Sequence, residues 1–411
     1  MDSTELTEYQ YELILRKKHL KLSEGKIPAV VIGSDITALG VIRSLSRVGI
    51  PTFIISHKND FVRYSRWAKP IRPLVKSFPT TDELADILNQ LQYERAVLFP
   101  CSDPSLLAVA DLSPELKELF PSCLPSKKTI ESLVHKGKFA EVLRATKVPH
   151  PKTIILENSD QIEKEETKYL TNFFIKPFHS WEFQHHFGTK SFRILNVKDA
   201  LDKFHRAQNA GQQVMLQEYI PGPAHNHYFI DGFIDRLGRM RALFVRRRIR
   251  IYPKHFGNSS YCVSIPKLEA APAVESIVKI MNDIGYRGIF SAEFKFDERD
   301  NLFKILEINA RPWWYVEFAS QFGVNTCYLA YKDALGVPVA SISEYVEGAG
   351  CMHVFNDLRA IIMTNGMQKV TLKHWLWELL TSKKPIYSWD DPLPAIFNLI
   401  YTPYNYVRNR L

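Results

Sequence analysis

Three residues late in the chain have the types and spacing needed to hold a divalent cation. Glu293 lies in one segment rich in strand-forming residues, and Glu307 and Asn309 lie in the next. Because side chains alternate faces along a strand, Glu307 and Asn309 point the same way. If Asp297 and Phe303 flank a five-residue connection, Glu293 lies directly opposite Glu307. Facing carboxylates repel each other unless a positive charge separates them, and Mg²⁺ is typically held by carboxylates together with substrate phosphates.

The same segment has a plainer interpretation as a solvated hairpin. Exposed hairpins often carry Glu and Lys on one face as cross-strand ion pairs, and Lys295 could neutralise Glu293 in this way. The hairpin alone does not decide between these interpretations, so the rest of the chain has to.

Length, composition and charge limit the class of protein. With 411 residues, of which 45% are hydrophobic and 24% charged, the chain is long enough for about two to four domains. Its net charge of +9 fits an anionic ligand, a nucleic acid or a membrane surface. The five cysteines show no paired or zinc-type spacing, which predicts reduced thiols in a cytoplasmic protein. We expect no membrane span, because no apolar run approaches about eighteen residues and the first residues lack a signal peptide's apolar core.

The first third of the chain alternates apolar strands with helices. A strand at 27–32, a helix at 37–48 and a strand at 52–56 form a βαβ unit, and another strand follows at 96–99. This alternation predicts an open parallel sheet over residues 26–125.

Polar residues follow two of these predicted strands. In open parallel sheets, ligands lie beyond the carboxyl ends of the strands. Ser34 and Asp35 come after the first strand and Asp103 after the last, so we expect all three near a substrate. For Asp103, capping of the following helix is the alternative interpretation.

The order of the later elements is more informative than any one of them. A basic helix at 126–146 precedes Lys176, which is near the end of the apolar strand FFIKP. QEYIPG follows at 217–222, an Arg-rich strand at 246–250, and then the hairpin that ends in EINAR. This succession resembles the ATP-grasp superfamily, and within it the carboxylate–amine ligases related to D-aspartate ligase and to carbamoyl-phosphate-synthase-type domains. The resemblance covers about residues 26–335.

The resemblance implies a fold of mixed α/β and α+β class. An N-terminal open parallel α/β domain at 26–125 would precede an ATP-grasp domain with antiparallel sheets, whose two lobes would span 126–216 and 217–335. We also expect a helical extension at 1–25 and a helical or irregular extension at 336–411.

The resemblance also implies how a nucleotide is bound. Lys138 and Lys176 would reach the phosphates of ATP as point charges, although Lys136 competes with Lys138 for this role. In the family an acidic residue just beyond the hinge commonly holds the ribose; this chain has no acid there, and Asn226 or His227 would substitute. The hinge that holds adenine would consist of Gln217, Glu218, Tyr219 and Ile220.

Further roles concern the metal ion and the transferred phosphoryl group. The ligands of Mg²⁺ or Mn²⁺ would be Glu293, Glu307 and Asn309. Arg311 would lie beside the γ-phosphate or an acyl phosphate, because its planar fork suits oxyanions. Arg248 foremost, and Arg246 on the same strand face, would contact an acyl phosphate or a substrate carboxylate. A solvated or nucleic-acid-binding strand is the alternative for these two arginines.

The implied function is an ATP-dependent ligase. It would activate a carboxylate as an acyl phosphate and join it to an amine, so its partners would be small molecules and no specific nucleic acid, with a homodimer as a candidate assembly. The segment 179–189, rich in His and aromatic residues, is expected to be a mobile loop that closes over the site, because water would destroy an acyl phosphate. The alternatives are a carboxylase or kinase-type ATP-grasp enzyme and a non-catalytic nucleotide-binding regulator.

Overall fold

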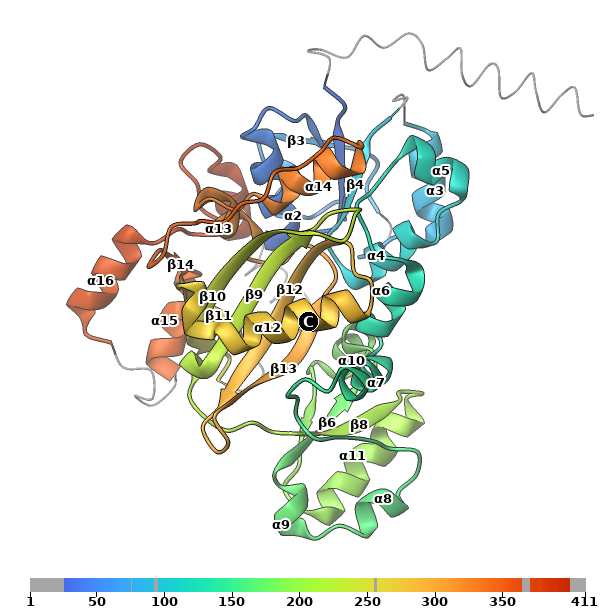
Figure 1. Ribbon diagram of the computed structural model, residues 1–411, viewed down its shortest axis with the longest axis vertical. Coiled ribbons are helices and arrows are strands. Elements are labelled where there is room, and N and C mark those ends of the chain that lie inside the picture. Colours follow the sequence, from blue (N-terminus) through green and yellow to red (C-terminus); the bar gives the residue numbers. More distant parts are fainter. Residues whose placement is uncertain (1–25, 75, 92–94, 255–256, 364–369, 400–411) are drawn as a thin grey trace, which may run out of the picture.

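A computed structural model describes most of the chain, which is built around three β-sheets (Figure 1). The helix predicted within residues 1–25 lies outside the described part. The described residues are 26–74, 76–91, 95–254, 257–363 and 370–399.

A parallel four-stranded sheet with the strand order β3-β2-β1-β4 forms the N-terminal domain. β1 and β4 are buried at every position, as expected for parallel strands that are covered on both faces. This sheet confirms the predicted open parallel α/β domain. Its elements are β1 (Ala29–Ile32), α2 (Asp35–Ser46), β2 (Thr52–Ile55), the 3₁₀ helix η1 (Phe61–Tyr64), β3 (Ala68–Pro70), α3 (Thr81–Asn89), β4 (Val97–Pro100), α4 (Asp103–Ala110) and α5 (Pro114–Leu119).

An antiparallel sheet with the order β5-β8-β6-β7 forms a separate lobe with a core of its own. We call it the first lobe; the predicted boundary at 216/217 falls within its strand β8. The elements, from two preceding helices onward, are α6 (Lys127–Val134), α7 (Lys136–Thr146), β5 (Thr153–Ile155), α8 (Asp160–Glu163), α9 (Thr167–Leu170), β6 (Phe173–Pro177), α10 (Ser180–Phe187), β7 (Phe192–Arg193), α11 (Val197–Asn209) and β8 (Val214–Glu218).

Two sequence predictions for this region are wrong. The basic helix at 126–146 is two helices, because His135 has an extended backbone and its Nδ1 caps α7 by accepting from the Lys138 N–H at 3.2 Å. The segment 179–189 is mostly the helix α10 and not a loop. Phe183 anchors this helix by packing, fully buried, into the core of the first lobe.

A six-stranded antiparallel sheet with the order β13-β12-β9-β10-β11-β14 lies at the centre of the molecule. One face packs on α12, α6 and α7, and the other shares a core with the N-terminal domain. Its elements are η2 (Ala224–Asn226), β9 (His227–Ile234), β10 (Met240–Tyr252), β11 (Asn258–Ser264), η3 (Lys267–Ala270), α12 (Ala271–Asp283), β12 (Gly288–Asp297), β13 (Leu302–Asn309), α13 (Val316–Gln321), α14 (Thr326–Ala334), β14 (Gly350–Met352), α15 (Val354–Met363) and α16 (Leu372–Thr381).

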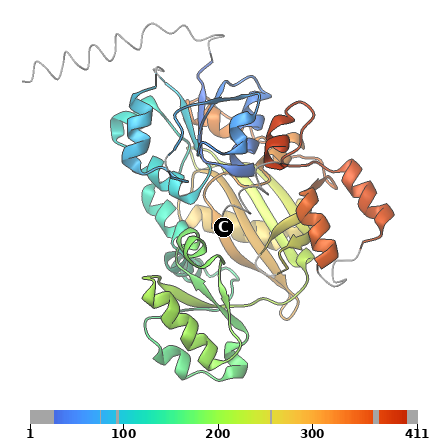
Figure 2. The same cartoon turned by 180° about the vertical axis from the view of Figure 1, so that it is seen from behind.

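The C-terminal extension is part of this central sheet, because β14 pairs with β11. Seen from behind, the first lobe in green and the C-terminal helices in red lie at different edges of the molecule (Figure 2). Within the residues that the structure describes, none of the helices combines the length and apolarity that a transmembrane segment requires.

Buried ion pairs attach α15 and α16 to the sheet. Arg250 of β10 donates to Asp357 of α15 at 2.9 Å and to Glu378 of α16 at 2.7 Å, and all three side chains are at most 5% exposed. Ser260 and the indole N–H of Trp375 donate to the same Asp357 carboxylate. The two helices therefore turn their polar sides towards a single guanidinium group.

Replacing Arg250 with Met should lower the free energy of unfolding by about 3–5 kcal/mol, because two buried carboxylates lose their cation. Arg247→Met, on the same strand, is the matched control: its half-buried ion pair with Glu269 should contribute at most about 1 kcal/mol. Urea denaturation of both variants measures the difference, and equal losses would contradict a special role for Arg250.

Candidate active site

The hairpin of β12 and β13 brings the predicted metal ligands together. Glu293 pairs directly with Glu307 across the two strands. Asn309 lies two residues beyond Glu307 on the same strand, so both side chains are on one face of the sheet. The structure thus places two carboxylates and one carboxamide at a common site.

The register of this hairpin differs from the predicted one in its details. Asp297 pairs with Leu302, which leaves a connection of four residues in place of five. A register shift then leaves Leu306 without a partner residue on β12 and restores the alignment of Glu293 with Glu307. This bulge adds the apolar side chain of Leu306 to the wall of the adjoining pocket.

Two cations and a neutral histidine from three other elements contact the two acids; burial and Arg248 lower the pKa of His227 to about 4. Glu293 Oε1 accepts from Arg248 at 3.1 Å and lies 2.8 Å from His227 Nδ1, while Glu307 accepts from Lys136 at 3.0 Å. Burial would raise the pKa of Glu293, but Arg248 and His227 hold it well below its usual range. Lys136 is the main cause that lowers the pKa of Glu307 to about 2. Both acids are therefore ionised at neutral pH.

The residues at this site fit Mg²⁺ or Mn²⁺ provided that a substrate completes the coordination. Ionised carboxylate and amide oxygens are hard ligands of the kind that these ions prefer. Over the described ranges, His, Cys, Asp and Glu form no group of three that could hold a metal ion by itself. Glu293, Glu307 and Asn309 would need further oxygen atoms, and phosphates supply such atoms in most Mg²⁺ sites.

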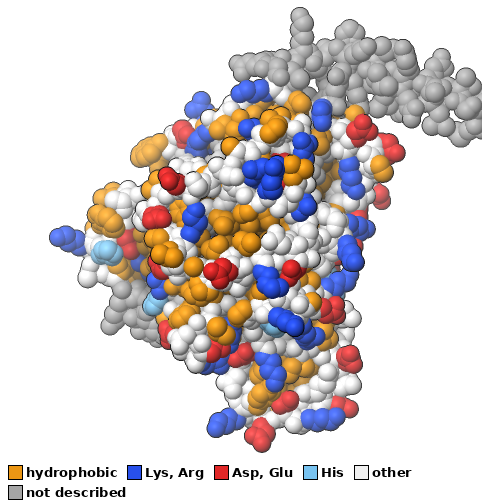
Figure 3. Space-filling model, viewed as in Figure 1, with side chains coloured by type: hydrophobic (Ala, Val, Ile, Leu, Met, Phe, Trp, Pro, Cys, Tyr) orange, Lys and Arg blue, Asp and Glu red, His pale blue; other side chains and the backbone are white. Residues whose placement is uncertain are grey.

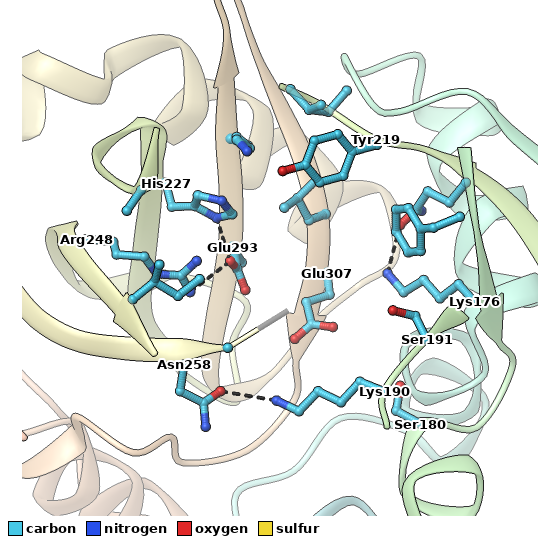
Figure 4. Close-up of a pocket in the computed structure, with 18 of the residues that line it drawn as sticks. Lys176, Ser180, Lys190, Ser191, Tyr219, His227, Arg248, Asn258, Glu293 and Glu307 are labelled. Carbon is cyan, nitrogen blue, oxygen red and sulfur yellow. Dashed lines mark hydrogen bonds and ion pairs between the residues drawn. The ribbon is translucent and has the colours of Figure 1, made fainter. Parts of the chain in front are cut away.

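A pocket between the first lobe and the central sheet adjoins the acids. Figure 4 shows Glu293 and Glu307 side by side on the hairpin, with Lys176 approaching from the opposite lobe. Lys176 Nζ donates to the neutral amide of Gln217 at 2.9 Å. Burial, together with the nearby Lys136, lowers the pKa of Lys176 to about 8, so an anion bound in the pocket would favour its charged form.

The predicted hinge lines this pocket, and its polar residues have distinct partners. Glu218 accepts from Arg299 at 2.6 Å, and Tyr219 lies under the ammonium group of Lys295. Ile220 is buried in the wall. The hinge residues in the pocket lining are Gln217, Glu218, Tyr219 and Ile220.

The two candidates for a ribose contact are placed differently. His227 lines the pocket next to Glu293. Asn226 is buried, and its amide donates to Glu298 at 2.9 Å. His227 lines the pocket and Asn226 is not among its lining residues, so we keep His227 as the candidate for this contact.

Lys138 was predicted to reach the phosphates, but the structure turns it away from the site. It is exposed and pairs with Glu131 at 3.3 Å, whereas Lys136 is buried against Glu307. Residues two positions apart on an α-helix point about 200° apart around its axis, so only one of these lysines can face the sheet. The competing candidate, Lys136, is the one that meets the acids.

A second pocket lies between the central sheet and the N-terminal domain. Both hairpin acids line it, together with Asn309 and Arg311. Arg311 donates to Asp103 at 2.6 Å and to Asn309 at 3.4 Å. Asp103 thus orients Arg311, a cation in the wall of the pocket. The two roles predicted for Asp103, a substrate contact and helix capping, did not include this ion pair.

Arg246 belongs to this second pocket and is almost completely buried. It donates to Asp231 at 2.7 Å, and its guanidinium group lies between the rings of Phe229 and Tyr315, at 3.9 and 4.8 Å from their centroids. Its Nη1 finds no acceptor among the described residues. Because this donor is enclosed by protein atoms, what Arg246 presents to the second pocket is its positive charge.

Ser34 and Asp35 line the opposite wall of the second pocket. Asp35 adopts a left-handed backbone with a φ of 67°, and its N–H donates to Asp60 at 3.3 Å. Burial raises the pKa of Asp35 to about 6. Such strain at a partly buried acid is typical of functional sites.

Sequence reasoning missed two polar residues near the pockets. Lys190 donates to Asn258 at 3.1 Å and so connects the first lobe with β11 (Figure 4). Asp60 supports the backbone at Asp35 from 25 residues away. Neither residue has a pattern around it that predicts these contacts.

Comparisons with known proteins agree with this geometry. The sequence matches no protein-family model. D-Aspartate ligase from Enterococcus faecium (strain Aus0004) is 23% identical over 327 residues, which cover 76% of this chain and 77% of that protein. The chain is thus similar in sequence to D-aspartate ligase over most of its length. D-alanine–D-alanine ligase from Wolbachia pipientis wMel is 22% identical over 44% of this chain and 55% of its own.

Solved structures support the ATP-grasp fold. The biotin carboxylase domain of Hydrogenobacter thermophilus 2-oxoglutarate carboxylase, in complex with MgADP and bicarbonate, has a TM-score of 0.62 at 18% identity and covers 78% of this chain and 72% of its own. L-Amino acid ligase from Bacillus licheniformis has a TM-score of 0.59 at 15% identity, with 77% and 75% covered. These neighbours include carboxylases as well as ligases.

Lys136→Met should weaken the binding of MgADP by at least about tenfold, because Glu307 then loses the cation that holds it in place and ionised. Lys138→Met is the matched control: the same change is made two residues away on an exposed side chain, and affinity should stay within about twofold. Isothermal titration calorimetry measures both, and an equal loss in the two variants would show that the effect is not specific to Lys136.

Proposed function

We propose that the protein is an ATP-dependent ligase that activates a carboxylate as an acyl phosphate and joins it to an amine, with release of ADP and phosphate. The observation that carries this proposal is that Glu293 and Glu307 line both pockets. A nucleotide in one pocket and a carboxylate in the other would meet at these acids. The similarity to D-aspartate ligase, D-alanine–D-alanine ligase and L-amino acid ligase supports this choice.

The nucleotide would lie with its base at the hinge and its phosphates towards Lys176. Lys176 offers a compact charge to the phosphates, as phosphoryl transfer needs charge neutralisation more than covalent help. Mg²⁺ held by Glu293, Glu307 and Asn309 would supply further positive charge to the phosphates when bound. His227 is our candidate for the ribose contact.

The carboxylate would lie in the second pocket, where arginines are already oriented. Asp103 holds Arg311, which would stabilise the transferred phosphoryl group and the acyl phosphate. Arg248 donates to Ser259 at 2.9 Å as well as to Glu293, so it stands at the junction of the two pockets. Arg246, which lines the same pocket, would attract a substrate carboxylate through its charge.

The amine-bearing substrate would approach from the N-terminal domain, where Ser34 and Asp35 face the second pocket. The acyl phosphate has to be kept from water until the amine arrives. The Lys190–Asn258 contact closes the first lobe against the sheet at this junction. We place the reaction in the cytoplasm, which the five free cysteines support.

ADP release in the presence of Mg²⁺ tests the proposal. We expect ATP turnover to require both an amino acid or other small carboxylate and an amine, and mass spectrometry to detect a product equal to their sum minus water. ADP release that depends on bicarbonate, with a gain of CO₂ in the product, would indicate a carboxylase instead. ATP binding without turnover across the whole panel would indicate a regulatory protein.

Glu307→Gln should reduce turnover by at least about 10²-fold, because it removes one of the two negative charges that would hold the metal ion. Lys176→Ala should cause a comparable loss of turnover, because the phosphates of ATP lose a positive charge that would stabilise them. Both variants should keep the wild-type circular dichroism spectrum.

Glu131→Gln is the matched control for Glu307→Gln. It makes the same change in an exposed carboxylate, which pairs with the exposed Lys138. It should retain wild-type turnover. Normal activity in Glu307→Gln or in Lys176→Ala would remove the proposed role of that residue.

A further inference from the structure

The helices α15 and α16 have their polar and apolar sides reversed relative to ordinary surface helices. Most surface helices bury an apolar stripe and expose charged residues. Here the acids Asp357 and Glu378 point inward to Arg250 and are almost completely buried. The outward sides of both helices are consequently free of exposed carboxylates.

The outward sides carry large apolar residues at helical spacing. Ile362 is 68% exposed and Leu380 is 80% exposed, and neighbours at i−4 or i−8 extend each stripe. Hydrophobic side chains gather next to basic ones at the left edge of Figure 3, over α16. The exposed apolar residues are Phe355, Leu358, Ile362 and Met363 on α15, and Leu372, Leu376, Trp377 and Leu380 on α16.

The same kind of surface continues into the residues that follow α16. Trp389 is 88% exposed, and the helical residues 393–399 expose Leu393, Ile396 and Leu399. A largely apolar cavity of about 200 Å³ lies between Phe355 and Leu399 and joins this segment to α15. We call the exposed apolar residues of α15, α16 and 389–399 the C-terminal apolar face.

The charges beside this face have one sign. Arg359 on α15 and Lys373 on α16 are exposed, and Lys384 lines the cavity. Asp390 is exposed too, but it is paired with Arg47. In a two-fold dimer built on this face, the basic residues would meet their own copies, which is unfavourable. An apolar layer with an anionic surface is the complementary partner.

We propose that the C-terminal apolar face lies on the surface of a membrane that contains anionic lipid. Helices of 10 residues, as α15 and α16 are, are about half as long as a membrane span and can only lie in the interface. Trp377 and Trp389 would sit at the headgroup level, and Arg359 and Lys373 would contact lipid phosphates. The binding needs no ATP and is independent of the proposed reaction.

Vesicle flotation with the full-length protein tests this proposal. Wild-type protein should float with mixed phosphatidylcholine–phosphatidylglycerol vesicles, and less with phosphatidylcholine alone or at high salt. Leu380→Asp should weaken the binding by at least about tenfold. Leu268→Asp is the matched control, since Leu268 is 85% exposed on η3 and its replacement should leave flotation unchanged.

Charge reversal separates the lipid headgroup from simple hydrophobic adhesion. Lys373→Glu should weaken binding to the anionic vesicles several-fold, while Lys198→Glu, the same change on the exposed side of α11, should have little effect. Equal effects of the two changes would overturn the assignment to this face. Thermal melting of each variant confirms that it is folded.

Two results would overturn the proposal as a whole. One is a wild-type protein that does not float with anionic vesicles even at low salt. The other is a concentration-dependent dimer, seen by light scattering, that Leu380→Asp dissociates, because a second copy of the chain would then occupy the face. Glu307→Gln should float like the wild type, so a failure of the ligase proposal leaves this test intact.

Discussion

The fold depends on holding two ionised carboxylates opposite each other on neighbouring strands. Glu293 and Glu307 would repel each other in an isolated hairpin, and burial would increase the cost. Arg248 from β10 and Lys136 from α7 supply the compensating charges, and His227 from β9 adds a hydrogen bond. The site is therefore a property of the assembled domain, in which a helix and four strands meet around one pair of acids.

The facing acids could be predicted because alternation along a strand is a local rule. The prediction reached the right pair through a connection one residue too long, and the bulge at Leu306 compensates for that difference. A bulge leaves no pattern in a single sequence, so only the structure reveals it. The same limit applies to Lys136 and Lys138, because the helix break at His135 interrupts a basic run that reads as continuous.

Contacts between distant segments were beyond the reach of sequence reasoning. Asp103 and Arg311 were both expected near a substrate, yet nothing in their surroundings indicated that they bind each other across 208 residues. Arg250 lies in the predicted Arg-rich strand at 246–250, but its partners lie in the C-terminal helices. By contrast, the parallel sheet followed from short periodic segments, whose hydrophobic pattern is local, and the mixed fold class followed from the resemblance to the ATP-grasp superfamily.

The pairing of β14 with β11 has a consequence for how the protein can be shortened. β14 has three residues and covers the outer side of β11, from Tyr261 to Val263. A chain cut before residue 350 would leave the backbone groups of that strand open to pairing with other molecules, which is a common route to aggregation. The short strand β14 thus protects the edge of the central sheet, whatever else the C-terminal residues contact.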